Sequence, residues 1–150
     1  MPIPIDPEVL RSQPLFSSLT HEELEDLGSH LFEKKCVLGT TLFVEGMSGE
    51  ILYLVRQGRV EILKTMPDGS EQVLASLRPG QFLGEMTLIE DQPRSATARV
   101  AEESVLLVMT KKSFQAMLEK YPKMSVKILL EFLKTANQRL RLANESHKQV

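Results

Sequence analysis

The segment GEMTLIEDQPRSAT, residues 84–97, holds residue types that together can bind a phosphate and a sugar. Arg94 carries a planar, permanently charged fork that suits two phosphate oxygens. Gly84 has no side chain, so its backbone N–H can approach a ligand closely. The carboxylate of Glu85 would be repelled by a phosphate but can accept hydrogen bonds from sugar hydroxyls, and we expect it to lie near Arg94 as well. The segment therefore predicts one short turn that holds a phosphate and a sugar.

The start of this segment also indicates how the backbone takes part. Residues 84–89 can form about one and a half helical turns, in which the N–H groups of Glu85 and Met86 would be unpaired donors suited to an anion. Gln92 precedes a proline and is therefore disfavoured in helical conformation, so the chain must turn there.

The end of the segment adds smaller groups. Ser95 supplies a hydroxyl, and Ala96 supplies a free N–H beside a small side chain. The alternative interpretation is an ordinary ion pair between Glu85 and Arg94 at the rim of a barrel, since most charged side chains are solvated.

The segment lies in a block, residues 33–111, whose short runs of Val, Leu, Ile and Thr predict strands. The runs are TTLFVEG, ILYLVRQG, VEILKT, EQVLASLR, ATARVAE and SVLLVMT. Turn signals separate them at Gly46 to Gly49, Gln57-Gly58, Pro67-Asp68-Gly69 and Pro79-Gly80. Strands that recur every ~8–12 residues indicate an all-β barrel or sandwich.

Helices are predicted on both sides of the strand block. Residues 1–32 carry leucines at helical spacing, and Thr20 followed by Glu23 predicts a capping box with Thr20 as the N-cap. Residues 112–147 predict two helices, because KKSFQAMLEK is followed by Pro122, which can begin the next helix. The interpretation is one domain over residues 1–150, mainly β with flanking helices.

The last predicted helix has two apolar sides. One side follows steps of three and four residues and forms a heptad seam: Val126, Leu129, Leu133, Ala136, Leu140 and Ala143. Ile128 and Phe132 form a second stripe. We therefore expect this helix to pack on its own barrel and to offer the seam to a second copy of the chain.

The composition excludes several classes. The net charge of -2 argues against a general nucleic-acid binder, and the single cysteine, Cys36, cannot build a disulfide framework. The N-terminus does not resemble a signal peptide, and no apolar run approaches the ~20 residues that span a membrane, so we expect a cytoplasmic protein with no membrane partner. The strand block contains no histidine and no catalytic arrangement is evident, so we expect neither a metal site nor an enzyme.

The run GEMTLIEDQPRSATARV resembles the phosphate-binding cassette of the cyclic nucleotide-binding domain family, whose pattern is roughly F-G-E-x-x-L, a short spacer and P-R-[SAT]-A-[TS]. The glycines that match the usual glycines of that family are Gly39, Gly46, Gly49, Gly58, Gly80 and Gly84. The resemblance covers about residues 14–146, with Leu83 as a conservative departure where the family often has Phe. It implies a barrel of the double-stranded β-helix or jelly-roll type, with the cassette at residues 83–97.

The resemblance also implies roles for residues. Glu85 would accept from the ribose 2′-hydroxyl, Arg94 would pair with the cyclic phosphate, and the N–H groups of Gly84 and Ala96 would help to hold both. Ser95 would touch the phosphate or, in a ligand with guanine, the base. Leu83 and Met86 lie beside these residues as further ligand contacts or as core.

In the family the base is covered by the long C-terminal helix. The candidates here are Leu140 and Leu142 as apolar lids, Arg139 or Arg141 as a stacking plane, and Asn144 as a hydrogen-bonding group. A solvated or coiled-coil face is the alternative for each of them.

The predicted function is reversible binding of a cyclic nucleotide, cAMP in preference to cGMP, with no further cofactor. Binding would shift the C-terminal helix, which would signal to a dimer mate or an unidentified effector protein, without direct nucleic-acid contact. The alternatives are the sensor half of a catabolite-activator-type transcription regulator without its helix-turn-helix, and a scaffold that dimerises without ligand.

Overall fold

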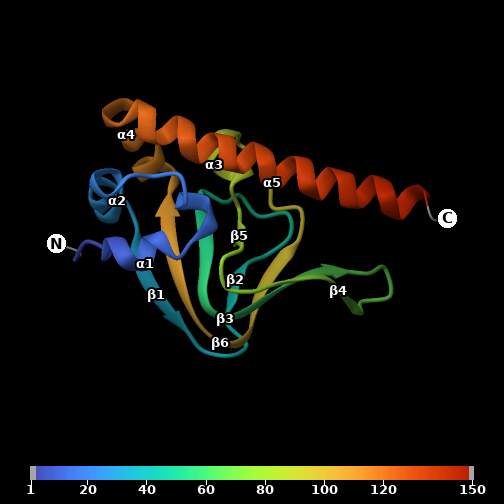
Figure 1. The fold of residues 1–150 in the computed structure, drawn as a ribbon. Helices are drawn as coiled ribbons and strands as arrows, with labels where there is room; N and C mark the ends of the chain where they lie inside the picture. Colours follow the sequence, from blue (N-terminus) through green and yellow to red (C-terminus); the bar gives the residue numbers. More distant parts are fainter. Residues whose placement is uncertain (1–2, 149–150) are drawn as a thin grey trace.

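The computed structural model describes residues 3–148, with side chains up to Glu145, and shows one curled antiparallel sheet flanked by helices (Figure 1). The elements are α1 (Pro7–Arg11), η1 (Pro14–Phe16), α2 (His21–Leu27), η2 (Gly28–His30), β1 (Phe32–Cys36), β2 (Thr41–Phe43), β3 (Ile51–Thr65), β4 (Glu71–Leu77), β5 (Phe82–Leu83), α3 (Met86–Ile89), β6 (Thr97–Thr110), α4 (Lys111–Lys120) and α5 (Pro122–Lys148). The predicted fold class, a β core with flanking helices and a long C-terminal helix, is confirmed.

Two long strands organise the sheet. The strand order is β1-β6-β3-β4, while β2 also pairs with β6 and β5 also pairs with β3. The turn predicted at Gln57-Gly58 is wrong, because β3 continues through it with register shifts against β6 between Val55 and Val60. The runs ATARVAE and SVLLVMT likewise form one strand, β6. A local irregularity therefore bends the strands where the sequence suggested a reversal.

The helical ends form a second layer over one end of the sheet. The predicted capping box is confirmed, since Thr20 Oγ1 accepts from the N–H of Glu23 at 3.2 Å and the Glu23 carboxylate accepts from the Thr20 N–H at 2.9 Å. The core between the layers includes Phe132 of α5, whose ring centroid lies 5.5 Å from that of Phe82 and 6.3 Å from that of Phe114. Hydrophobic burial of these rings fixes α5 on the domain.

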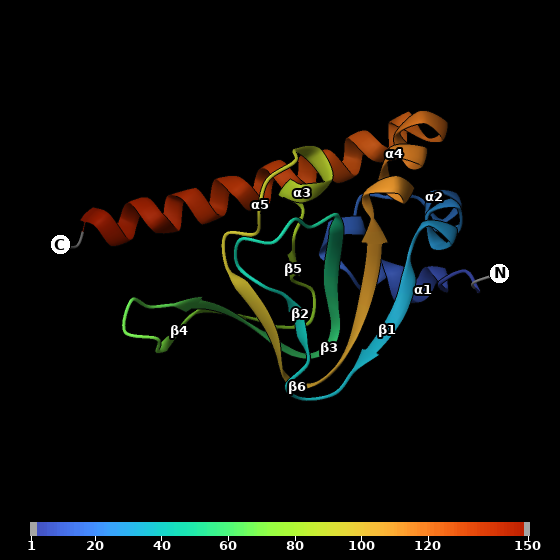
Figure 2. The same ribbon diagram turned by 180° about the vertical axis from the view of Figure 1, so that it is seen from behind.

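Helix α5 crosses that end of the sheet and extends past the hairpin of β3 and β4 (Figures 1 and 2). Ile128 and Phe132 face the core, as the second apolar stripe predicts. Three residues of the predicted seam, Val126, Leu133 and Leu140, are more than half exposed, as an outward seam requires, whereas Leu129 is partly buried against the core. Within the residues that the structure describes, no helix is long and apolar enough to cross a membrane.

Candidate ligand-binding site

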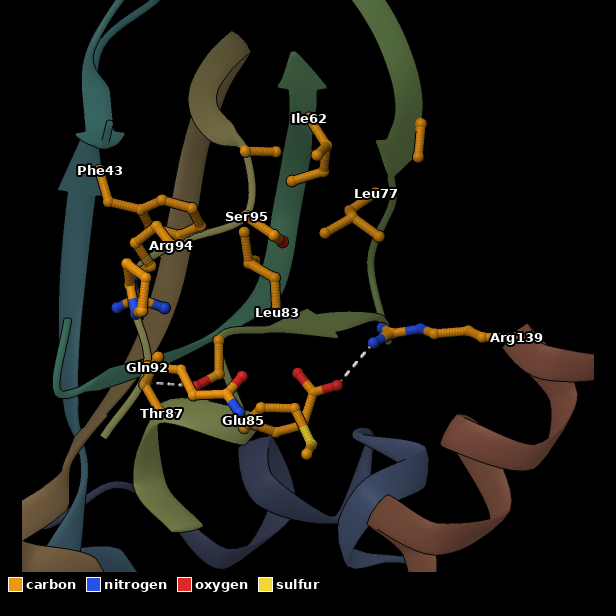
Figure 3. A pocket seen from close by; sticks show the side chains of 15 residues that line it. Phe43, Ile62, Leu77, Leu83, Glu85, Thr87, Gln92, Arg94, Ser95 and Arg139 are labelled. Atoms are coloured by element: carbon orange, nitrogen blue, oxygen red, sulfur yellow. Dashed lines mark hydrogen bonds and ion pairs between the residues drawn. The ribbon is translucent and has the colours of Figure 1, made fainter. Parts of the chain in front are cut away.

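A cavity of about 390 Å³ lies between the segment 84–96, the sheet and α5 (Figure 3). One wall is apolar and consists of Ile62, Ala75, Leu77 and Leu83. The polar side chains that face the cavity are Glu85, Thr87, Gln92, Arg94, Ser95 and Arg139. The combination of an apolar wall and a few polar side chains is typical of a small-molecule site.

Arg94 is held at the inner end of this cavity and is only 5% exposed. Its Nη2 donates to the carbonyl of Ile51 at 3.0 Å, and its guanidinium carbon lies 4.1 Å from the ring centroid of Phe43. Its Nε is buried without a hydrogen-bond partner. Burial lowers the pKa of Arg94, an effect opposed by the nearby Tyr53 and Glu85. A buried, incompletely paired cation favours an anionic ligand.

Two glycines make room for this arginine. Gly84 has φ +90°, and a Cβ there would lie 2.5 Å from the Ile51 carbonyl oxygen and 2.6 Å from Nη1 of Arg94. A Cβ at Gly49 would overlap the Arg94 guanidinium itself. The backbone of Arg94 is also fixed, since its N–H donates to Met47 and its carbonyl accepts from Gly46, both at 2.8 Å. The Gly46–Gly49 loop, which the sequence predicted as a turn, therefore holds Arg94 in position.

The helix after Gly84 is shorter than predicted. Residues 84–89 were expected to be helical, but α3 comprises only Met86–Ile89, with Glu85 at its N-cap. Both the N–H and the hydroxyl of Thr87 donate to the Gly84 carbonyl, at 3.2 and 2.7 Å. This tight turn places the Glu85 side chain inside the cavity, where the residue is 7% exposed.

Glu85 is paired differently from the prediction. Its carboxylate accepts from Nη1 of Arg139 at 2.6 Å, and Nη2 of Arg139 donates to the carbonyl of Phe82 at 2.9 Å (Figure 3). The charge of Glu85 raises the pKa of the expected neighbour, Arg94, but the two side chains form no ion pair among the described residues. An ordinary Glu85–Arg94 pair at a barrel rim is therefore wrong.

The other predicted cassette residues all line the cavity. Leu83 and Ala96 are buried, Ser95 is exposed at the mouth, and Met86 is 48% exposed. Phe43, which contacts Arg94 and lines the cavity, was not predicted as a site residue. It lies far before the cassette in the chain, and a single aromatic residue does not indicate a ligand contact until the fold is known.

The lid predicted at Leu140 and Asn144 does not lie against this cavity and stays a prediction. Both side chains are exposed and neither lines the cavity, because each helical residue turns by about 100° and Arg139 is the one that faces inward. A second cavity of about 420 Å³ lies beyond Arg139 and includes Gln81, Gln138 and Leu142. Arg139 therefore lies between two cavities. This position is compatible with its predicted role as a plane on which the base stacks, which stays a prediction.

Comparisons with known proteins identify the relatives of this chain. A family model described as the cyclic nucleotide-binding domain matches residues 33–121. The Cyclic AMP receptor protein of Thermus thermophilus is 35% identical over 114 residues, which are 75% of this chain and 52% of that protein. The cAMP-dependent protein kinase regulatory subunit of Yarrowia lipolytica is 32% identical over 109 residues, which are 73% of this chain and 28% of that protein. The chain therefore spans about half or less of these relatives.

A solved structure shows the same fold. A cyclic nucleotide-binding domain from Methylobacillus flagellatus superimposes with a TM-score of 0.81 at 27% identity and covers 93% of this chain and 78% of that one.

Proposed function

Because the chain belongs to the cyclic nucleotide-binding domain family, we propose that the cavity beside Arg94 binds a cyclic nucleotide, cAMP in preference to cGMP, and that the domain acts as a sensor. The observation that carries the proposal is the buried and incompletely paired guanidinium of Arg94, a residue that lines a cavity with an apolar wall. The names of the two relatives support cAMP as the ligand.

The chemistry of the site follows from its side chains. The Arg94 guanidinium pairs with the cyclic phosphate, and Glu85 accepts a hydrogen bond from the ribose 2′-hydroxyl. The N–H groups of Gly84 and Ala96 assist, and the apolar wall formed by Leu77 and its neighbours covers the base. These groups bind the ligand reversibly, without a reaction and without a further cofactor.

The output of the domain passes through α5. Arg139 lies on α5 and pairs with Glu85, so a ligand at Glu85 acts on the helix directly. The outward seam of α5 carries this change to a second copy of the chain or to an effector protein. The lone cysteine supports a cytoplasmic location, and the relatives are regulatory proteins, which supports a role other than catalysis.

A second candidate is the sensor part of a longer transcription regulator. It is favoured by the match to the Cyclic AMP receptor protein, of which the aligned residues cover 52%. In both candidates the cavity binds the same ligand, so the same binding experiment applies.

The test is calorimetric titration of the purified protein with cAMP and cGMP, alongside Arg94→Ala. Truncating one partner of a buried charge pair costs ~2–5 kcal/mol, or about 30- to several-thousand-fold in affinity. We expect the wild type to bind cAMP at micromolar or lower concentration and Arg94→Ala to lose that binding. Arg78→Ala, an exposed arginine outside both cavities, serves as the matched control and should bind as the wild type does.

Binding of neither nucleotide would contradict the proposal and favour a scaffold that dimerises without ligand. If Arg94→Ala fails to fold, which circular dichroism reports, Arg94→Lys retains the charge without the fork and should bind cAMP more weakly than the wild type.

A further inference from the structure

Glu85 poses an electrostatic problem for an anionic ligand. It lines the same cavity as Arg94 and is 7% exposed, so water screens its charge poorly. A phosphate bound at Arg94 would add a second negative charge to this enclosed space. Two negative charges that are both shielded from water repel one another strongly. Without another cation, Arg94 alone would have to balance both the Glu85 carboxylate and the phosphate.

Arg139 solves this problem from another element. Its Nη1 lies 2.6 Å from the Glu85 carboxylate, while its Nη2 is fixed by the Phe82 carbonyl at 2.9 Å. Its guanidinium carbon lies 5.5 Å from the Phe82 ring centroid. The cavity therefore contains two cations and one carboxylate, a surplus of one positive charge that equals the single negative charge of a phosphodiester.

The two partners of this pair are unequally exposed. The Glu85 side chain is 9% exposed and the Arg139 side chain is 46% exposed. If the Arg139 charge is lost while α5 keeps its place, Glu85 remains as a largely buried, unpaired anion in the same cavity as Arg94. Loss of Arg139 is therefore costly mainly at Glu85.

We infer that Arg139 is the counter-charge that makes Glu85 compatible with a bound cyclic phosphate, so that docking of α5 and binding of the nucleotide strengthen one another. This inference rests on the proposed function. The coupling is reciprocal by thermodynamic necessity: a helix that favours the ligand is itself held in place by the ligand. Arg139 is thus a positioning residue: it pairs with Glu85 and acts on the phosphate only through that carboxylate.

The test is a double-mutant cycle on cAMP affinity with Arg139→Met, Glu85→Gln and the double variant. In the wild-type background, Arg139→Met should weaken cAMP binding about tenfold to hundredfold. In the Glu85→Gln background, where no carboxylate needs balancing, the same change should cost less than about threefold. Arg141→Met is the matched control, because Arg141 is exposed and outside both cavities, and it should leave affinity unchanged.

Two further readouts separate this role from stacking on the base. Arg139→Lys keeps the charge and should restore most of the affinity, whereas a lysine cannot replace a stacking plane. Hydrogen exchange of residues 136–145 should slow on addition of cAMP in the wild type and not in Arg139→Met.

An equal loss from Arg139→Met in both backgrounds, or no rescue by lysine, would overturn the inference and leave cAMP binding intact. A wild type that does not bind cAMP would overturn the proposed function and this inference with it.

Discussion

The two halves of α5 are held in different ways. The inner half, residues 122–135, buries Met124, Ser125, Ile128 and Phe132 against the domain. In the outer half, residues 136–145, every residue is exposed, and the Arg139 side chain connects this half to Glu85 and Phe82 by polar contacts. The same helix is therefore anchored by hydrophobic burial at one end and attached to the ligand cavity by an arginine at the other.

This difference shows how a continuous helix can contribute both stability and response. Contacts that bury apolar area are worth several kcal/mol and do not depend on a ligand. Polar contacts at a partly exposed site are worth less and change when a charged ligand arrives. Under the proposed function, the outer half would shift between positions at a cost that one small ligand is able to offset, while the inner half would keep its place.

The largest effect is expected where the inner half meets the core. Phe132→Ala removes a ring that packs between Phe82 and Phe114, and we expect it to lower the free energy of unfolding by ~3–5 kcal/mol. Leu140→Ala in the outer half, which is 59% exposed, should change it by less than ~0.5 kcal/mol. Chemical denaturation of both variants measures this contrast. Equal losses at the two positions would show that the halves are anchored alike.

The sequence predicted the buried half well, because burial leaves a repeating pattern. Ile128 and Phe132 stand four residues apart, and the capping box at Thr20 and Glu23 is a local signal. The sheet was predicted for the same reason, except that a bulge near Gln57 gave the same glycine signal as a turn.

The candidate site was less predictable where it depends on contacts between distant segments. The residues of the turn could be found because they are contiguous, as with Glu85 and Arg94. The partner of Glu85 lies 54 positions further along and is fixed only by how α5 crosses the sheet. A shift of one residue along a helix moves a side chain by about 100°, so the sequence offered Leu140 and Arg139 as candidates alike, and only the fold shows that Arg139 lines the cavity.

A smaller effect is expected on the outward face of α5. Leu133 is 65% exposed and belongs to the same seam as Val126 and Leu140. If the seam joins two copies, each buried leucine contributes ~1.5–3 kcal/mol to association. We expect the wild type to sediment as a dimer and Leu133→Glu as a monomer in analytical ultracentrifugation.

Lys134→Glu is the matched control for the dimer, because it places a carboxylate on an exposed neighbouring position outside the seam. It should leave the dimer intact. A wild type that sediments as a monomer at every concentration would assign the seam to another partner.

The smallest effect concerns the one ion pair that ties the inner half to α2. Lys127 Nζ lies 2.6 Å from the Glu23 carboxylate. Burial raises the pKa of Glu23, but hydrogen bonds from Lys127 and Thr20 outweigh it, and the net pKa is lowered from 4.5. A carboxyl whose pKa is lower in the folded state stabilises the protein above its ordinary pKa and loses that contribution as the pH falls through the lowered value.

We therefore expect Lys127→Met to reduce the free energy of unfolding by only ~0.2–1 kcal/mol at neutral pH, since both side chains are partly exposed. The difference from the wild type should shrink as the pH falls below 4.5, the ordinary pKa of Glu23. Denaturation curves from pH 7 down to the lowest pH with cooperative unfolding measure this. If Lys127→Met lowered the free energy of unfolding as much as Phe132→Ala does, a charge pair and not burial would anchor the inner half. The two halves of α5 would then differ only in their exposure.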